Sequence, residues 1–321
     1  MRAWLIALFL ALFPSYALAG DNPAGQQLLD DAAKLIHIQG PGKAPFQMEV
    51  DFQAQISIPH QGHLTVQWAS NDLWYWDLKM EDYREIQVRR GEMVYTKRNA
   101  PFTPLALTRL QNLLGVFQVD SRRWEVQKIK PNNGLSCVQL KSRLSHSHGE
   151  ICLEPDSKHV MSTEFTGDDY GRKQVFSEYQ PFHDNSYPRE LNYFEHGSQV
   201  LRLTIVSLND KSLEDSVFTP PQNSVARRKC ENLVQAIPVK QPRPPYPPSD
   251  VQNLMSGTTI VALTVQEDGS VSDVQIVQTA EHEMDRQTVE TVKTWKFKPA
   301  MCGNDPVASD ITVEVNFRPS Q

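Results

Sequence analysis

Hydrophobic and polar positions alternate along much of the first two thirds of the chain. The clearest run is residues 46–58, FQMEVDFQAQISI, in which every second side chain is apolar and the others are mainly Gln, Glu, Asp and Ser. This period of two is typical of a long antiparallel strand with one buried face. Similar runs follow at 63–70, 73–80, 84–90, 92–98, 124–130, 135–142, 158–165, 172–180, 189–195 and 199–208. The pattern therefore predicts a large, curved antiparallel sheet.

Two segments of this region have helical spacing instead. Residues 24–40 place Leu28, Leu29, Ala32, Leu35 and Ile36 on one face, and Gly40-Pro41 ends the run. Residues 107–117 carry a leucine stripe, with Gly115 as the expected stop. The stripe consists of Leu107, Leu110, Leu113 and Leu114. We expect both helices to cover the sheet.

The last quarter of the chain predicts a small ββαβ domain. Two runs rich in Val, Ile and Thr, 258–265 and 270–277, are joined across Asp268-Gly269, which favours a hairpin. Residues 281–295 then form an amphipathic helix, because Met284, Thr288, Val292 and Trp295 recur at helical spacing. Pro299 stops the helix, and 311–317 alternates as a final strand. The fold class expected for the whole chain is α+β.

The residues that punctuate this quarter resemble the TonB C-terminal domain family. The family pattern has Tyr-Pro at its start, Gly before the first strand, Asp-Gly at the turn, Met-Asp opening the helix, Trp-x-Phe-x-Pro-Ala closing it, and Gly-x-Pro-Val before a last strand that ends in Phe. The matching positions are Tyr246, Pro247, Gly257, Asp268, Gly269, Met284, Asp285, Trp295, Phe297, Pro299, Ala300, Gly303, Pro306, Val307 and Phe317. An added Cys302 and one extra residue before Pro306 put no expected element in doubt.

In that family the domain works in energy-coupled transport across the outer membrane, where it pairs with a short extended segment of a receptor. The resemblance implies recognition by strand addition, in which an edge strand with unpaired backbone groups accepts another strand. The candidate edge is the last strand, made of Ile311, Thr312, Val313, Glu314, Val315, Asn316 and Phe317.

The region before it resembles, more weakly, the half-barrel fold of the LolA/LppX-type periplasmic lipoprotein-carrier superfamily. The residues that carry this resemblance are Trp68-Ala69-Ser70, Trp74, Asp82-Tyr83, Glu178-Tyr179, Phe182, Tyr187-Pro188 and Phe218-Thr219-Pro220-Pro221. In that superfamily the concave face of the sheet receives acyl chains. A groove with Phe52, Trp68, Trp74 and Trp76 would suit such a ligand, and an ordinary core built from the same side chains is the alternative.

The first twenty residues predict export. They contain Arg2, an apolar run of 3–13 and an Ala17-Leu18-Ala19 cleavage-like site, which is typical of a secretory signal peptide, with an uncleaved anchor as the alternative. The expected organisation is a signal peptide at 1–19, a LolA-like domain at 20–221, a basic, Pro-containing linker at 222–243 and a TonB-like domain at 244–321. We expect a periplasmic protein, with membrane association as a further option.

Four cysteines in an exported chain predict two disulfides, although three pairings are formally possible. Cys137 and Cys152 lie in two adjacent runs that read as strands around a polar turn, which suits a cross-strand bridge. Cys230 and Cys302 would then tie the linker to the last domain. Metal ligation or a free thiol is the alternative, but no Cys-x-x-Cys spacing supports it.

Charge and motifs narrow the possible functions. The chain has a net charge of −6, and the basic cluster Arg227-Arg228-Lys229 lies in the expected linker, so nucleic-acid binding is not predicted. We interpret the linker as a solvated tether, with contact to anionic lipid as the alternative. The chain contains no Gly-x-Ser-x-Gly, phosphate loop, His-Glu-x-x-His or dinucleotide motif. His60 and His63, and His146 and His148, read as exposed loop residues. We therefore predict no enzyme activity, cofactor or metal site.

Two functions remain. The first is an envelope protein that docks, through its last strand, to an outer-membrane or periplasmic partner in TonB-type transport. The second is a periplasmic lipid or lipoprotein carrier, or an envelope-assembly adaptor, with an acyl ligand in the first domain. Since the sequence shows neither a retained anchor nor a long Pro/Lys-rich spacer, it favours partner docking over force transduction.

Overall fold

The computed structural model describes residues 22–56, 58–114, 119, 123–167, 170–230, 233–247 and 256–318. The signal peptide predicted at 1–19 lies outside these residues. No helix in this described part of the chain has the length and apolar character needed to cross a membrane.

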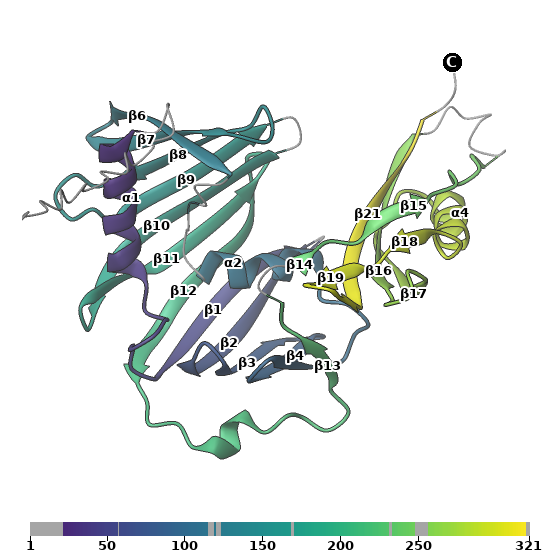
Figure 1. Cartoon of the computed structure of the whole chain (residues 1–321), viewed down its shortest axis with the longest axis horizontal. Coiled ribbons are helices and arrows are strands. Elements are labelled where there is room, and N and C mark those ends of the chain that lie inside the picture. Colours follow the sequence, from purple (N-terminus) through teal and green to yellow (C-terminus); the bar gives the residue numbers. More distant parts are fainter. Residues whose placement is uncertain are drawn as a thin grey trace, which may run out of the picture.

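One large antiparallel sheet dominates the first part of the chain (Figure 1). Among the described residues its strand order is β13-β5-β4-β3-β2-β1-β12-β11-β10-β9-β8-β7-β6. The strands are β1 (Phe46–Ile56), β2 (Ile58–Ser70), β3 (Leu73–Met80), β4 (Arg84–Arg90), β5 (Met93–Arg98), β6 (Trp124–Asn132), β7 (Leu135–Ser142), β8 (His148–Leu153), β9 (Val160–Gly167), β10 (Tyr170–Phe182), β11 (Asn185–Glu195), β12 (Ser198–Asp210) and β13 (Val225–Arg228). The long meander predicted from alternation is therefore present.

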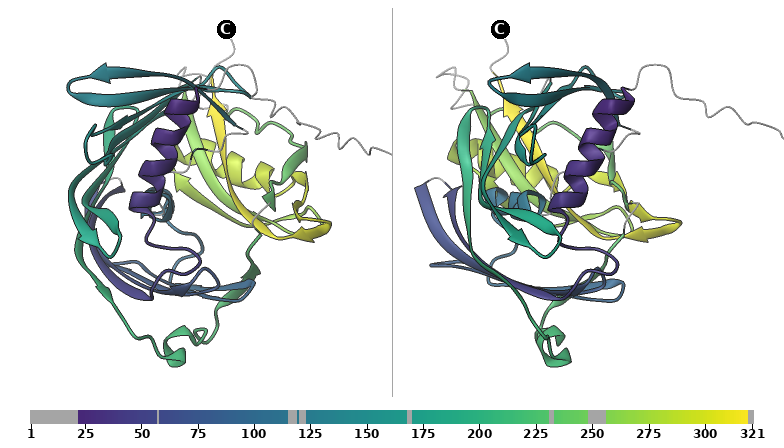
Figure 2. Two further views of the ribbon diagram at one scale, coloured as in Figure 1. Left: turned by 60° about the vertical axis from the view of Figure 1, so that its left-hand side comes forward. Right: turned by 90° about the vertical axis from the view of Figure 1, so that its left-hand side faces the viewer.

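Helices cover the inner face of this sheet, which curves around α1 (Figure 2). Helix α1 (Pro23–Ile36) begins where Asn22 Oδ1 accepts a hydrogen bond from the Gly25 amide, and it buries Leu29, Ala32 and Ile36. The leucine stripe forms a short 3-10 turn, η1 (Leu105–Arg109), followed by α2 (Leu110–Leu114), and the stop predicted at Gly115 lies outside the described residues. A second 3-10 turn, η2 (Asp215–Phe218), follows β12. The apolar side chains of α1, η1, α2 and the sheet form one buried core.

The sequence prediction of a single strand over 46–58 is wrong. Strand β1 ends at Ile56, and β2 begins at Ile58 and pairs back along β1. The residues around His60 and His63, which we expect to form a loop, instead lie inside β2. Within this stretch, a Cβ atom at Gly62 would come within 2.2 Å of Phe52 Cζ. Gly62 thus permits a close approach of an aromatic ring rather than a change of chain direction.

The last part of the chain forms a second, smaller unit with its own core. Strands β16 (Gly257–Val265), β17 (Val271–Gln278) and β21 (Ser309–Phe317) form a sheet in the order β17-β16-β21, and α4 (His282–Val292) packs on it. Three short strands follow the helix: β18 (Lys296–Lys298), β19 (Ala300–Cys302) and β20 (Asp305–Val307).

The segment between the two units pairs with both of them, unlike the solvated tether that we predict from its composition. Strand β13 adds to β5 of the large sheet. After it, β14 (Leu233–Val234) pairs with β19, and β15 (Ile237–Lys240) pairs with β18. Two basic side chains of this segment are also engaged: Arg227 binds Asp310, and Arg228 binds Glu92 and Asp305.

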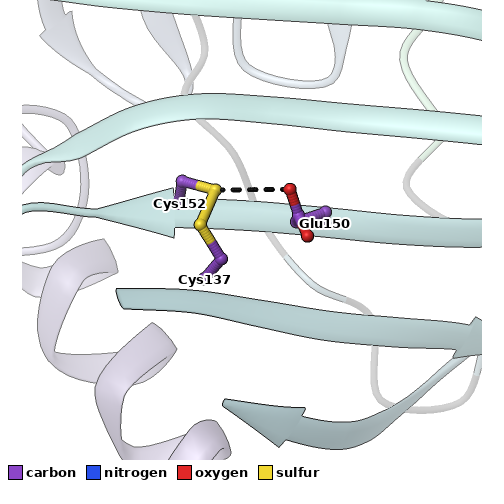
Figure 3. Close-up of side chains that lie close together, drawn as sticks. All are labelled: Cys137, Glu150 and Cys152. Atoms are coloured by element: carbon purple, nitrogen blue, oxygen red, sulfur yellow. Dashed lines mark hydrogen bonds between the residues drawn. A yellow bond between two sulfur atoms is a disulfide. The ribbon is translucent and has the colours of Figure 1, made fainter. Parts of the chain in front are cut away.

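Both expected disulfides are present. Cys137–Cys152 joins directly opposite residues of β7 and β8, and Cys230–Cys302 joins the connecting segment to β19. Glu150 lies beside the first bridge, with Oε1 3.5 Å from Cys152 Sγ (Figure 3). Because both sulfur atoms are already bonded to each other, this group of three residues does not provide thiolate ligands for a metal ion.

Candidate functional site

Strand β21 lies at the edge of the smaller sheet. It pairs with β16 in continuous register from Gly257↔Phe317 to Val265↔Ser309, and in the described part of the chain no strand pairs with its other side. Its side chains alternate as the sequence predicts. Val315 and Phe317 are buried and Ile311 and Val313 are half-buried, whereas three polar side chains are exposed. These are Thr312, Glu314 and Asn316.

The opposite edge of the same sheet, β17, is irregular. Its pairing with β16 shifts register twice, between Ile260 and Val261 and between Ala262 and Thr264. Asp273 on β17 also has a positive φ of 51°. Bulges of this kind twist an edge and interrupt its row of hydrogen-bonding groups, which protects it from further pairing. Of the two edges, β21 therefore presents the longer regular run of backbone groups.

A buried carboxylate fixes the start of α4 against β16. Asp285 accepts hydrogen bonds from Thr259 Oγ1 at 2.7 Å, from the Ala280 amide at 3.1 Å and from the Thr279 hydroxyl. Burial raises the pKa of the Asp285 carboxyl, but the hydrogen bonds from Thr279 and Thr259 outweigh burial, and the resulting pKa is lowered. Helix α4, which packs on β16 and β17, is thus held by an ionised side chain.

Other residues of the predicted motif hold the two ends of this unit together. Tyr246 packs edge-on against Phe317, the last residue of β21, with ring centroids 6.0 Å apart. Trp295 donates its indole N–H to the Pro242 carbonyl at 3.0 Å, which fixes the connecting segment to the end of α4. Pro247 is buried, while Pro299 is half-buried between β18 and β19.

Three glycines of the motif occupy different structural environments. Gly269 has φ +77°, and a Cβ atom there would lie 2.0 Å from the Phe297 carbonyl oxygen. At Gly257 a Cβ atom would lie 2.8 Å from Ala280 Cβ. Gly303 has φ +64° in a turn with open space around it. The motif residues therefore shape the scaffold of this unit.

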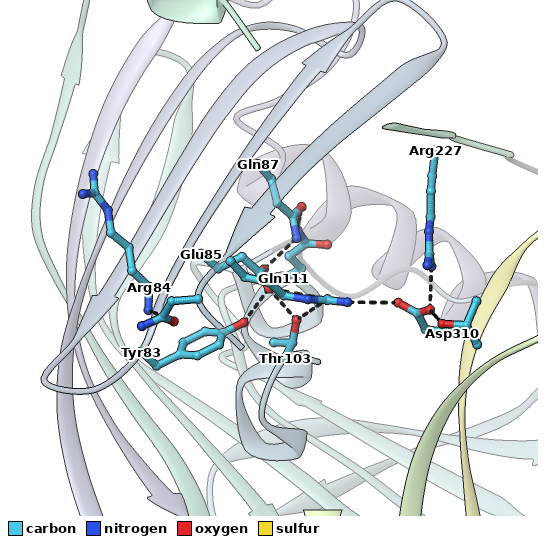
Figure 4. Close-up of polar contacts among 11 residues, drawn as sticks. Tyr83, Arg84, Glu85, Gln87, Thr103, Gln111, Arg227 and Asp310 are labelled. Atoms are coloured by element: carbon cyan, nitrogen blue, oxygen red, sulfur yellow. Dashed lines mark hydrogen bonds and ion pairs between the residues drawn. The ribbon is translucent and has the colours of Figure 1, made fainter. Parts of the chain in front are cut away.

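A polar network joins the base of β21 to the large sheet (Figure 4). Asp310 binds Arg227 at 2.7 Å and Arg98 at 3.4 Å, and it accepts a hydrogen bond from Thr264 Oγ1 at 2.8 Å. Both arginines come from the edge of the large sheet, Arg98 from β5 and Arg227 from β13. This contact, together with the Cys230–Cys302 disulfide, fixes where β21 begins relative to the large sheet.

A second candidate site is a cavity of about 620 Å³ on the inner face of the large sheet. Its apolar wall comes from β1, β2 and β3 and includes Trp68, Trp74 and Trp76, as the groove prediction proposed. Phe52, from the same prediction, is buried against Gly62 and does not line the cavity. Trp68 and Trp76 line the cavity and also belong to the buried core.

The cavity has a polar rim. Arg89, whose side chain is 9% exposed, donates to Asp72 Oδ1 at 2.6 Å and to the Gly91 carbonyl at 3.1 Å. Lys229 lines the same cavity from the segment that continues to Cys230. On the other side, Tyr187 donates to the Leu114 carbonyl at 2.8 Å and holds the end of α2 in place. Burial raises the pKa of Tyr187, so it remains a donor.

The histidine prediction is wrong for His60 and His63, which lie inside β2 rather than in a loop, and for His148, which begins β8. Of these, His63 contacts two carboxylates. Its Nδ1 is 2.7 Å from Asp51 Oδ1 and its Nε2 is 2.8 Å from Glu49 Oε2 on the neighbouring strand. The hydrogen bond with Asp51 raises the pKa of His63 most, and Glu49 adds to it against the opposing effect of burial. An imidazolium that donates to two carboxylates explains this arrangement without a metal ion.

Comparison with known proteins identifies the smaller unit. Residues 242–319 match the family model described as Gram-negative bacterial TonB protein C-terminal. The chain is 24% identical to Protein TonB from two strains of Xanthomonas campestris pv. campestris over 105 residues, which cover 32% of this chain and 47% of the relative. It thus spans about half the length of the curated relatives it matches. The resemblance predicted from the motif residues is confirmed for this part of the chain.

Solved structures show more distant likeness. The solution NMR structure of the Pseudomonas aeruginosa TonB CTD is 24% identical, with a TM-score of 0.25, and the match covers 29% of this chain and 95% of that one. The crystal structure of a putative outer membrane lipoprotein-sorting protein domain from Vibrio parahaemolyticus is 10% identical, with a TM-score of 0.40, covering 61% of this chain and 96% of that one.

Proposed function

We propose that the protein works in the bacterial cell envelope and docks an extended segment of an outer-membrane or periplasmic partner along β21, in TonB-type transport. The observation that carries this proposal is the continuous, unshifted pairing of β21 with β16, which leaves a regular edge over Ile311–Phe317, whereas β17 at the opposite edge of the sheet is bulged. A partner strand would satisfy the backbone groups on the outer side of that edge. The match of residues 242–319 to the TonB C-terminal family supports the same role.

The exposed side chains of the edge would select the partner. In a strand, side chains on one face recur at every second residue, so Thr312, Glu314 and Asn316 stand on the face opposite the core. Glu314 accepts a hydrogen bond from Asn316 Nδ2 at 2.9 Å, and Asn316 Oδ1 accepts one from the Thr258 hydroxyl at 2.6 Å. This face is polar with one carboxylate, which favours a polar partner segment over an apolar one.

Two disulfides support a location in the periplasm, because disulfides form and persist in oxidising compartments. Both domains that we predict, 20–221 and 244–321, would then work in that compartment, with 222–243 pairing against each of them.

A capture experiment with the full chain tests docking. Val313→Pro introduces a proline ring and removes a backbone N–H in the middle of β21, which disrupts strand pairing. We therefore expect capture of the envelope partner to fall at least about tenfold. Val274→Pro makes the same change on the bulged β17 edge and should retain the partner. Equal capture by both variants, with both proteins folded by circular dichroism, would show that β21 is not the docking edge.

The cavity favours a second function, transport of an amphiphilic ligand. Its volume of about 620 Å³ lies in the range of small-molecule sites, and its lining includes Trp68, Trp74 and Trp76. We therefore propose an acyl or lipid ligand as the alternative cargo of the large domain.

Native mass spectrometry of the full chain tests this alternative. We expect a co-purifying mass of lipid size that is lost in Trp74→Ala, since Trp74 lines the cavity and is only partly buried in the core. A protein that carries no added mass, and gains none when incubated with oleate, would rule the carrier function out.

A further inference from the structure

A continuous series of polar contacts runs from the cavity wall toward the base of β21. It starts at Gln111 on α2, which lines the cavity and donates to Gln87 Oε1 at 2.9 Å. Gln87 in turn donates to Glu85 Oε1 at 2.7 Å. Gln87 and Glu85 stand two residues apart on β4 and so share one face of the sheet, and the contacts leave the cavity along that face (Figure 4).

Glu85 is the centre of this series, and only 3% of it is exposed. Its carboxylate accepts hydrogen bonds from Tyr83 at 2.6 Å and from Thr103. Burial and the nearby Glu85 carboxylate raise the pKa of Tyr83, so its phenol stays protonated and donates. A buried carboxylate is costly whenever one of its donors moves away, because part of its charge is then left unsatisfied. We therefore expect Tyr83, Glu85 and Thr103 to move together.

Arg98 carries the series across to the smaller unit. Its Nη1 donates to Thr103 Oγ1 at 3.3 Å, and its Nη2 reaches Asp310 at 3.4 Å. Asp310 directly precedes the proposed docking residues of β21 and also binds Thr264 on the adjoining strand β16. One guanidinium thus touches both the hydroxyl that serves Glu85 and the carboxylate at which the docking edge begins.

We propose that this series, Gln111–Gln87–Glu85–Thr103–Arg98–Asp310, couples the cavity wall to the docking strand, so that the position of α2 sets how firmly β21 is held. The proposal rests on the proposed docking function for its biological meaning. Coupling is reciprocal. If a shift of α2 changes the free energy of partner binding at β21, then partner binding changes the free energy of that shift by the same amount. The protein would then sense, at the cavity, whether its partner is bound.

Amide hydrogen exchange of the full chain, followed by mass spectrometry on peptides that cover 309–317, tests the coupling without any ligand. Thr103→Val keeps the side-chain shape but removes the hydroxyl that bridges Glu85 and Arg98, leaving only their 4.0 Å ion pair, and Gln111→Ala removes the first contact at the cavity. We expect exchange in 309–317 to rise at least about twofold in each variant, the lower end of coupling within one network. Thr166→Val, an exposed change on β9, should leave these peptides unchanged.

Arg98→Lys provides a second variant if Thr103→Val does not fold. Lysine keeps the charge but cannot contact Thr103 and Asp310 with one planar fork, so exchange in 309–317 should rise here as well. Two results overturn the proposal. In the first, the variants exchange in 309–317 at the wild-type rate although their β4 and β5 peptides exchange faster. In the second, exchange rises equally throughout the chain. Because partner capture is measured separately, coupling without docking and docking without coupling are distinguishable.

Discussion

Replacing Gly269 by alanine is expected to lower the free energy of unfolding of the smaller unit by about 3 kcal/mol or more, since a left-handed backbone and an overpacked contact each cost about 1–3 kcal/mol. Gly269 has φ +77°, and the added Cβ would lie 2.0 Å from the Phe297 carbonyl oxygen. The backbone there cannot easily move away, because the Phe297 amide donates to the Gly269 carbonyl at 3.0 Å. Urea denaturation of the full chain, followed by tryptophan fluorescence, measures the loss.

Gly303→Ala is the matched control. Gly303 also has a positive φ, +64°, but no atom lies within 4 Å of the position that a Cβ atom would take. Alanine there should cost only the backbone term, about 1–2 kcal/mol. If the two substitutions destabilise the protein equally, the close contact between the Asp268-Gly269 turn and Phe297 does not exist in solution.

Removing the Cys230–Cys302 disulfide is the second change with a large expected effect. Its two cysteines are 72 residues apart, and closing a loop of that length in the unfolded chain corresponds to about 4 kcal/mol. We expect the double variant Cys230→Ser, Cys302→Ser to lose about that much stability. The same bridge anchors the connecting segment beside β19, so exchange of amides in β14 should also rise.

The Cys137–Cys152 disulfide provides the comparison for this loss of stability. Cys137 and Cys152 are 15 residues apart and already face each other on paired strands, so their removal should cost less, about 3 kcal/mol. Chemical denaturation of both double-serine variants under identical conditions compares the two losses. Because Cys137 and Cys152 are buried, serine hydroxyls there add a desolvation cost, so the test of the joining role is the Cys230–Cys302 loss itself, and a loss well below about 4 kcal/mol would contradict it.

The sequence predicts local elements of this fold well. Strict alternation in FQMEVDFQAQ and the following runs locates the strands of the large sheet, because one face of each is buried. Asp268-Gly269, Trp295 and Phe297 mark the smaller unit for reasons visible in the structure, namely a left-handed turn, an indole hydrogen bond and a close backbone contact. The predicted end of the first strand is wrong, because β2 already begins at Ile58 and Gly62 within it makes room for the Phe52 ring.

Contacts between residues distant in sequence are not predictable in this way. Arg98 and Asp310 are separated by 212 positions, and neither stands in a motif. Arg227 reads as part of a solvated basic cluster until β13 is seen to pair with β5. His63 is similar, since its two carboxylate partners lie across the β1–β2 hairpin. These side chains acquire their roles only when the sheet places them together, and no local periodicity records that placement.

Site-specific photo-crosslinking in the intact envelope tests the central claim, partner docking on β21, most directly. A photoreactive residue at Glu314, exposed on β21, is compared with one at Gln275, exposed on β17. Docking on β21 predicts a crosslinked partner from Glu314 that disappears when Val313→Pro is added, and none from Gln275. A partner crosslinked only from Gln275, or from Glu314 with and without Val313→Pro alike, would contradict docking at this edge.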